Sequence, residues 1–300
     1  MEKVDCALCG SNNSCKILTS RGTLPYFDNY VFSLVQCKDC GLIYLNPRPA
    51  QQEISKLYGE KGCLNDGKFG FLERKVGNLL LTARVRRIMK YKKNGRILDI
   101  GCGDGEFLLL LYKKGWKTYG IDISRKACKL ATDKLKQNIL NHELKDCNFP
   151  EAYFDLITLN HVLEHLLDPN KELREIHRIL KGRGMLLICV PNIGSFQFKI
   201  SKEHWFGLRL PWHVYQYSPN TIVAMLKKNG FEVVKITYPS FDFPLSLFHS
   251  LNTKWQNAHS RLFSTIYFLP LILASIIANL FPLFLSWRPT IEVIARKYNF

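Results

Sequence analysis

Acidic side chains are scarce in this 300-residue chain. It has 25 aspartates and glutamates against 42 lysines and arginines, a formal net charge of +17 at pH 7. Such a charge favours anionic partners, either nucleic acid or an acidic membrane surface, but does not determine a fold. One stretch, the basic run, has no acidic residue at all, and it indicates a surface for an anionic partner or a solvated helix face. Its basic residues are Arg84, Arg86, Arg87, Lys90, Lys92, Lys93 and Arg96.

The chain also lacks an apolar segment directly after Met1. Because Glu2, Lys3 and Asp5 follow instead, we expect no secretory signal and a cytoplasmic location. With 47% hydrophobic and 22% charged residues, the composition excludes general disorder and favours a globular protein. Thiols stay reduced in the cytoplasm, so the 10 cysteines point to metal ligands or isolated buried thiols rather than disulfides.

Four of these cysteines form two C-x-x-C-G motifs, which begin at Cys6 and Cys37 and have 27 residues between them. Two such pairs brought together by a hairpin supply the four soft ligands of a closed tetrahedral zinc site. The glycine that ends each motif suits a tight turn whose N–H groups face the sulfurs. A redox pair and an iron–sulfur site are the alternatives. The predicted ligands of structural zinc are Cys6, Cys9, Cys37 and Cys40.

Short apolar runs alternate with amphipathic stretches from about residue 96 to residue 190. This pattern is typical of a mainly parallel sheet with helices on both faces, a doubly wound α/β fold. We predict strands at 96–101, 117–122, 139–144, 154–160, 184–191, 231–238 and 290–297. We predict helices at 105–114, 124–136, 170–181 and 218–229.

The region before the last predicted strand is unusual, because Leu262 to Trp287 contains no charged residue and no histidine. As a helix it is long enough to span a bilayer. A single crossing would, however, separate strand 290–297 from its sheet. An apolar helical hairpin that enters one leaflet, with the basic run as electrostatic anchor, avoids this conflict. The alternative is a pair of helices buried against the core or a second subunit.

The predicted organisation therefore has five parts. They are a zinc-binding module at 1–48, a helical linker or cap with the basic run at 49–94, an α/β core at 95–240, a segment containing the apolar hairpin at 241–289, and the final core strand at 290–300.

Gly101, Gly103 and Gly105 stand between the first core strand and the first core helix, where a cofactor must approach the backbone closely. Their spacing differs from the G-x-G-x-x-G of pyrophosphate-binding turns. Asp99 precedes them, and a carboxylate there repels phosphates but attracts an ammonium group, as in adenosylmethionine. Asp122 ends the second strand, where it can accept hydrogen bonds from both ribose hydroxyls. Capping of the next helix is its alternative role.

Three stretches, Ile97–Gly105, Gly120–Asp122 and Phe154–Pro169, resemble class I S-adenosylmethionine-dependent methyltransferases of the ubiquinone-biosynthesis type. The cysteine motifs and Pro211–Pro219 resemble a subgroup with an N-terminal zinc module, found among sugar C-methyltransferases. This resemblance implies S-adenosylmethionine as cofactor and a Rossmann-like, mainly parallel seven-stranded sheet.

The resemblance also implies which residues contact each part of the cofactor. The methionine part would be held by Asp99 and the glycine loop, the ribose by Asp122, and the adenine by Asp146 with Cys147 beside the ring. Asn160 and His161 would line the methyl-donor side. Asp146 and Cys147 could instead belong to an ordinary turn. The implied cofactor residues are Asp99, Gly101, Gly103, Gly105, Asp122, Asp146, Cys147 and Asn160.

Methyl transfer from a sulfonium needs no general acid, because the leaving group departs as a neutral thioether. The enzyme aligns the acceptor and supplies a base where the acceptor is a hydroxyl or a carbon acid. Histidine is the natural base near pH 7. His161 is the first candidate and His213 the second, with His165 behind them, and each could instead be structural.

We therefore expect methyl transfer to a small-molecule or lipid-linked acceptor at the cytoplasmic face of a membrane, with O-methylation favoured. Phe196–Tyr217 and Phe241–Ser260 would bind the acceptor. The charge supports RNA methylation as an alternative. A nucleic-acid partner is nevertheless not expected, because the base-gripping Asn-Pro-Pro-Tyr type of motif is missing after Asn160 and no aromatic-rich RNA-binding module is evident. The other alternative is a non-catalytic zinc-containing adapter.

Overall fold

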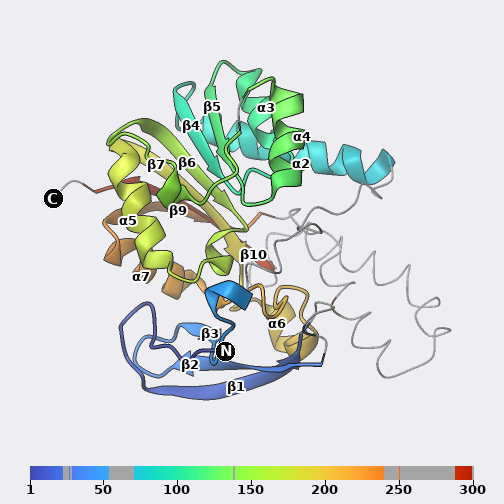
Figure 1. Ribbon diagram of the computed structural model, residues 1–300, viewed down its shortest axis with the longest axis vertical. Coiled ribbons are helices and arrows are strands. Elements are labelled where there is room, and N and C mark those ends of the chain that lie inside the picture. Colours follow the sequence, from blue (N-terminus) through green and yellow to red (C-terminus); the bar gives the residue numbers. More distant parts are fainter. Residues whose placement is uncertain are drawn as a thin grey trace.

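Two β-sheets organise the chain in the computed structural model, which describes residues 1–22, 27, 29–53, 71–137, 139–239, 250 and 288–298. The larger sheet lies at the centre and the smaller one packs against one end of it (Figure 1).

The central sheet has six strands among the described residues, in the order β5-β4-β6-β7-β10-β9. β4, β5, β6 and β7 run parallel, whereas β10 is antiparallel to both of its neighbours. The chain moves outward from β4 to β5 and then returns to β6 on the other side of β4. Ligands of doubly wound folds bind at such a switch point, beyond the carboxyl ends of the strands. The strands are β4 Arg96–Ile100, β5 Lys117–Ile121, β6 Phe154–Asn160, β7 Leu180–Pro191, β9 Phe231–Thr237 and β10 Thr290–Lys297.

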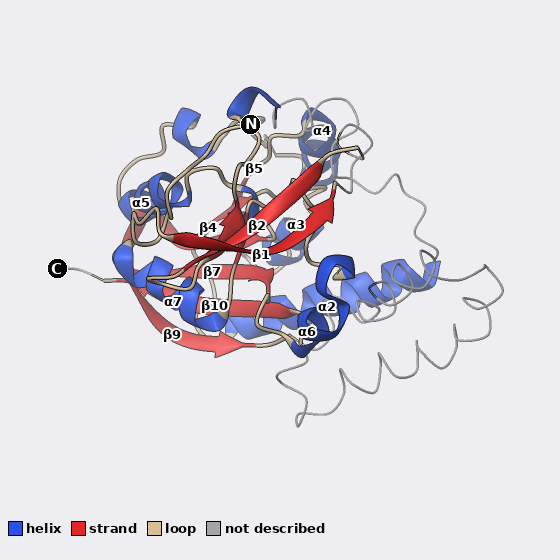
Figure 2. Ribbon diagram, turned by 90° about the horizontal axis from the view of Figure 1, so that it is seen from below, coloured by secondary structure: helices blue, strands red, loops and turns tan. Residues whose placement is uncertain are grey.

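Apolar side chains project from both faces of this sheet, as expected for buried parallel strands. Ile97 and Leu156 pack with α2, α3 and α4, whereas Leu98 and Ile157 belong to the cluster that includes α5 and α7. Figures 1 and 2 show α3 and α4 on one side of the sheet and α5 and α7 on the other. The doubly wound prediction is confirmed. The helices are α2 Phe71–Met89, α3 Glu106–Tyr112, α4 Arg125–Leu135, α5 Pro169–Ile179, α6 Phe196–Ser201 and α7 Pro219–Lys228, with short 3-10 helices η1 Leu144–Asp146, η2 Leu163–His165 and η3 Lys202–His204.

Of the seven predicted strands, the one at 139–144 is wrong. Only Leu140 pairs with the sheet, through a single bridge to Ile121, and the chain then turns into η1. The Asn141 side-chain amide donates to the Asp122 carbonyl oxygen at 2.9 Å. Polar side chains that bond the backbone in this way compete with a strand ladder, and only Ile139 and Leu140 supply apolar surface before η1.

The smaller sheet is antiparallel, in the order β1-β2-β3-β8. Its strands are β1 Ser14–Arg21, β2 Val31–Cys37, β3 Ile43–Leu45 and β8 Tyr215–Gln216. The first three belong to the predicted module at 1–48, but β8 comes from the core region. The buried residues of both parts form one continuous cluster.

Hydrogen bonds from two core helices hold the first cysteine motif in place. Lys228 of α7 donates to the carbonyl oxygens of Ala7 and Leu8 at 3.0 and 2.9 Å. Asn170 of α5 donates to the Ala7 carbonyl at 2.7 Å. The module is therefore fixed to the core at the motif itself as well as through β8.

Several residues of the basic run are bound to other parts of the protein. The run as a whole is therefore neither a solvated helix face nor an electrostatic anchor for a membrane. Arg87 donates to both oxygens of Glu292, at 2.8 and 2.7 Å, and this carboxylate is fully buried in β10. Arg84 lies 3.4 Å from the same carboxylate and is itself buried. Arg96 stacks 4.3 Å above the Tyr153 ring. Much of the run therefore neutralises groups within the protein, and this explains how β10 tolerates a buried glutamate.

Asp155 in β6 binds another member of the run. It accepts hydrogen bonds from the ammonium groups of Lys92 and Lys181 and from the Arg96 N–H, at 2.8 to 3.0 Å. Burial alone would raise the pKa of Asp155, but these donors lower it to about 2.

Replacing Asp155 with asparagine is expected to cost about 2 kcal/mol of unfolding free energy at pH 7, because the pKa of Asp155 in the folded protein is lowered to about 2. Because the folded-state pKa is depressed, this stability is present above about pH 4 and is lost as the pH falls toward 2. Urea titrations at several pH values measure both quantities. The Asp155→Asn variant should show a flatter loss between pH 4 and 2 than the wild type; an unchanged slope would contradict the assignment.

The predicted apolar hairpin at 262–287 lies outside the described residues. Within the described residues, no helix has both the length and the apolar character needed to cross a bilayer.

Candidate active site

A cavity of about 1230 Å³ opens at the switch point of the central sheet. Its floor is made by the carboxyl ends of β4, β5 and β7, and its walls include η2, α5, residues of the 142–148 segment, the segment before β8 and the start of β10. Pockets for a single small molecule usually enclose about 300–1,000 Å³. This cavity therefore has room for a cofactor and a second molecule beside it.

The glycine loop gives this cavity an open backbone wall. Gly101 and Gly103 line it, with φ of 70° and 56°, a conformation that favours glycine. A Cβ at Gly101 would lie 2.4 Å from a methyl group of Val162, whereas no atom of the described residues, chain neighbours aside, lies within 4 Å of the corresponding position at Gly103. Gly103 thus leaves backbone exposed to a ligand, as the sequence predicts.

Gly105 has a different role from the one predicted. It does not line the cavity, and a Cβ there would lie 2.9 Å from that of Ala131 in α4. Its φ of 76° also starts α3 without a side-chain cap. Gly105 therefore permits close packing of α3 and α4.

Asp122 lies at the edge of the cavity beside this loop. Its two carboxylate oxygens accept hydrogen bonds from the N–H groups of Gly103 and Ser124, at 2.9 and 2.8 Å. Ser124, not Asp122, caps α4. Each carboxylate oxygen keeps a second lone pair, so the side chain is positioned to receive the hydroxyls of a nucleoside. Asp122 fits the ribose role predicted for it.

Four other predicted cofactor residues do not line the cavity. Asp99 is buried beneath the loop, where it accepts a 2.6 Å hydrogen bond from Thr158, and burial raises its pKa to about 7. Asp146 and Cys147 belong to η1 and the turn after it, and their neighbours Leu144, Lys145 and Asn148 line the cavity instead. The structure therefore does not place Asp99, Asp146 or Cys147 where they would touch a ligand in the cavity. The fourth, Asn160, has a buried Oδ1 without a hydrogen-bond partner among the described residues.

The two predicted catalytic histidines both line the cavity, in different environments. His161 follows β6 and is partly exposed, with Nδ1 3.3 Å from Oε1 of Glu164 and Nε2 3.9 Å from the Cys189 sulfur. His213 is buried and directs Nδ1 to the Gly207 carbonyl oxygen at 2.6 Å. Burial, together with His165 nearby, lowers the pKa of His213 to about 3. At neutral pH His213 is uncharged and a weaker base than an ordinary histidine.

Glu164 is the residue that sequence reasoning missed. It is 1% exposed, and although burial alone would raise its pKa, His161 and the neighbouring histidines lower it to about 2. Glu164 lies inside the Phe154–Pro169 stretch that resembles methyltransferases, so the sequence did mark its region. Sequence periodicity, however, does not tell a buried carboxylate from one that caps a helix at the surface.

The predicted acceptor segments are only partly tested. Phe206 and Trp212 line the cavity, whereas Trp205 and Tyr215 are buried in the core. Residues 241–249 and 251–260 lie outside the described residues.

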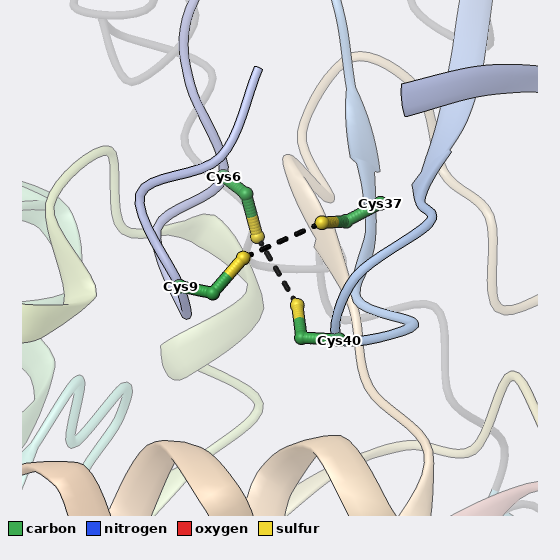
Figure 3. Close-up of side chains that lie close together, drawn as sticks. All are labelled: Cys6, Cys9, Cys37 and Cys40. Carbon is green, nitrogen blue, oxygen red and sulfur yellow. Dashed lines mark hydrogen bonds between the residues drawn. The ribbon is translucent and has the colours of Figure 1, made fainter. Parts of the chain in front are cut away.

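The four predicted zinc ligands come together, as Figure 3 shows, and Cys37 is the last residue of β2. The sulfurs of Cys6 and Cys40 lie 3.4 Å apart, as do those of Cys9 and Cys37, and all four fall within 4.8 Å of one another. Sulfurs around a tetrahedral zinc are about 3.8 Å apart, given bonds of about 2.3 Å. The arrangement fits a zinc ion and is too wide for disulfides.

The turns of the two motifs have the predicted shape. Gly10 and Gly41 adopt φ of 80° and 77°, and each donates its N–H to the carbonyl oxygen of the first cysteine of its motif, at 2.7 and 2.9 Å. Although burial raises the pKa of Cys37, the N–H groups of Cys40 and Asp39 outweigh it and lower this pKa. Backbone donors thus favour a thiolate at Cys37, the form that binds metal.

The small sheet continues directly into the wall of the cavity. Beyond the paired residues of β3 and β8, the Leu45 N–H donates to the Val214 carbonyl oxygen at 2.8 Å, and the Val214 N–H donates to the Glu164 carbonyl oxygen at 2.8 Å. These bonds connect the cysteine motifs, through β3, to the two histidine-bearing segments. The module therefore helps to form the histidine side of the cavity.

A glycine loop and a ribose-type carboxylate at the switch point of a doubly wound sheet define a class of α/β enzymes that bind a nucleoside cofactor. Comparison with known proteins identifies the family within that class. The sequence pattern of the family described as "Methyltransferase domain" matches residues 72–236. A ubiquinone biosynthesis O-methyltransferase from Pelagibacter ubique is 27% identical over 176 residues, covering 55% of this chain and 73% of that protein.

Two further similarities agree with this match. A demethylmenaquinone methyltransferase from Thermotoga maritima is 30% identical over 161 residues, covering 46% of this chain and 70% of that protein. A solved SAM-dependent methyltransferase from Archaeoglobus fulgidus, 25% identical, superposes with a TM-score of 0.50 and covers 75% of this chain and 98% of that one. The chain belongs to the methyltransferase family and is a class I S-adenosylmethionine-dependent methyltransferase.

Proposed function

We propose that the enzyme transfers the methyl group of S-adenosylmethionine to a hydroxyl of a small-molecule or lipid-linked acceptor at the cytoplasmic face of a membrane. The observation that carries this proposal is the single cavity that joins Gly101, Gly103 and Asp122 at one end to His161 and Trp212 at the other. The cofactor would occupy the first end and the acceptor the second.

Bound S-adenosylmethionine supplies an activated methyl group whose sulfonium sulfur leaves as a neutral thioether. The chain's own residues hold the reactants and manage one proton. Asp122 and the Gly103 backbone bind the cofactor, and Trp212 lines the acceptor end, with the Arg209 guanidinium 5.2 Å from the centre of its ring. His161 takes the hydroxyl proton on Nε2, while Glu164 holds Nδ1 and stabilises the resulting imidazolium.

His161 is preferred over His213 as the base for two reasons. Nδ1 of His161 lies 3.3 Å from the buried Glu164 carboxylate, which orients the ring, whereas burial lowers the pKa of His213 to about 3. The names of the relatives support quinone-type acceptors, and they include both an O-methyltransferase and a C-methyltransferase. RNA methylation has less support, because Arg84, Arg87 and Lys92 are bound within the protein.

We also propose that zinc occupies the four-cysteine cluster in a structural role, since all four tetrahedral positions are taken by sulfur. Its function would be to hold β3 against β8.

Transfer of a labelled methyl group to a panel of phenols, catechols, quinols, amines and RNA, with and without membrane extract, tests the proposed function. We expect label in hydroxyl-bearing organic acceptors and a loss of about 10²- to 10⁴-fold in kcat for His161→Gln. His177→Gln is the matched control, because His177 lies outside the cavity and bonds the Tyr298 carbonyl. Label found only in RNA would contradict the proposal.

A further inference from the structure

Glu164, His165 and His213 form a second cluster of potential metal ligands, separate from the cysteines. Glu164 and His165 belong to η2, and His213 precedes β8. One ligand atom from each lies within 4.8 Å of the other two. The imidazole rings of His165 and His213 are nearly perpendicular, with centroids 4.7 Å apart.

Both histidines are oriented in the way that metal ligands are. Nδ1 of His165 lies 3.0 Å from the Trp212 carbonyl oxygen, and Nδ1 of His213 lies 2.6 Å from that of Gly207. A carbonyl oxygen only accepts hydrogen bonds, so each Nδ1 carries the proton and each Nε2 has the free lone pair. Backbone carbonyls fix the tautomer of metal-bound histidines in this manner.

Glu164 supplies the independent observation. This carboxylate is 1% exposed, and its Oε1 lies 3.3 Å from Nδ1 of His161. Its Oε2 is buried and has no hydrogen-bond partner among the described residues. A buried carboxylate oxygen without a donor is costly, and a cation bound beside it removes that cost.

We propose that Glu164, His165 and His213 bind a divalent cation of the zinc class at the acceptor end of the cavity. Two imidazole nitrogens and one carboxylate oxygen are the ligand set of catalytic zinc sites, which keep a further position open. His165 and His213 line the cavity, so a cation held by them would lie beside the space assigned to the acceptor. This role rests on the proposed function: the cation would bind the acceptor hydroxyl and lower its pKa, and His161 would take the proton.

Metal analysis of the purified, zinc-saturated protein tests the site without reference to activity. We expect two zinc ions per chain in the wild type and one in His165→Gln, His213→Gln and Glu164→Gln. His142→Gln is the matched control, because His142 also lines the cavity but lies outside the cluster, and it should keep two. One zinc ion in the wild type, or two in all three cluster variants, would overturn the proposal.

Cobalt substitution of the wild type avoids any dependence on how the variants fold. Cobalt in the cysteine cluster gives intense sulfur-to-cobalt absorption. A second equivalent at the proposed site should add weaker visible bands with no further sulfur-to-cobalt intensity. Saturation at one equivalent, or sulfur-to-cobalt intensity that grows with both, would overturn the proposal. These readouts stay valid if the proposed methyl transfer fails, whereas full transfer activity in His165→Gln would refute only the contact with the acceptor.

Discussion

Replacing Cys37 with serine, or removing zinc with a chelator, is expected to unfold the N-terminal module and abolish methyl transfer while S-adenosylmethionine still binds. Structural zinc contributes about 10–16 kcal/mol of apparent free energy to small modules. β1 has little buried surface to replace that contribution. Without the module, β3 no longer pairs with Tyr215 and Gln216 or supports the histidine side of the cavity. The cofactor end is built from β4 and β5, which are not hydrogen-bonded to the small sheet.

Calorimetric titration with S-adenosylmethionine, the methyl-transfer rate and the β-sheet signal in circular dichroism, all on one sample, measure this effect. Cys15→Ser is the matched control, because Cys15 is an exposed β1 cysteine outside the cluster. It should behave as the wild type does. Full transfer activity in a zinc-free protein would show that the module does not support the acceptor side.

Replacing Asp122 with alanine is expected to weaken S-adenosylmethionine binding by about 10²- to 10⁴-fold. The variant loses two hydrogen bonds from a carboxylate to the ribose, worth about 1.5–3 kcal/mol each, and each 1.4 kcal/mol is about a factor of ten. It also loses the acceptors that hold the N–H groups of Gly103 and Ser124. Both effects act on the same end of the cavity.

Asp104→Ala is the control for this variant. Asp104 belongs to the same loop, but its carboxylate is 46% exposed, pairs with Lys134 and does not line the cavity. Calorimetry should give nearly wild-type affinity for Asp104→Ala. Equal losses in the two variants would mean that the loop, not the Asp122 carboxylate, determines affinity.

Local patterns predicted much of this fold. Strong apolar runs bounded by turn residues located β4, β5, β6 and β7, and the Ser218-Pro219 start located α7. The segment at 139–144 had too little apolar surface to become a strand. The pairing of β8 with β3 could not be foreseen, because two residues have no periodicity and their partner lies about 170 positions earlier in the chain.

Short spacings predicted the site better than single residues did. The two cysteine motifs come together, and Gly101, Gly103 and Asp122 line one cavity, because each is constrained by its own turn; Gly105 of the same loop instead packs against α4. Asp99 illustrates the limit. Its position before the loop suggested contact with an ammonium group, but whether its side chain faces the cavity or Thr158 depends on neighbouring strands.

Glu164 is a residue whose role in the site the sequence did not predict. His161 is only three residues away, but His213 reaches Glu164 only through the fold. No distance along the chain indicates that the second carboxylate oxygen of Glu164 has no hydrogen-bond partner among the described residues. Buried charge is therefore the property of this site that the sequence reveals least.

Isothermal titration of S-adenosylmethionine into the folded, zinc-replete wild-type protein measures whether the cofactor site exists. We expect one binding site per chain with a micromolar dissociation constant, and competition by S-adenosylhomocysteine. Absence of binding in protein whose zinc content and secondary structure are intact would contradict the cofactor site at Gly101, Gly103 and Asp122, and with it the methyl-transfer function.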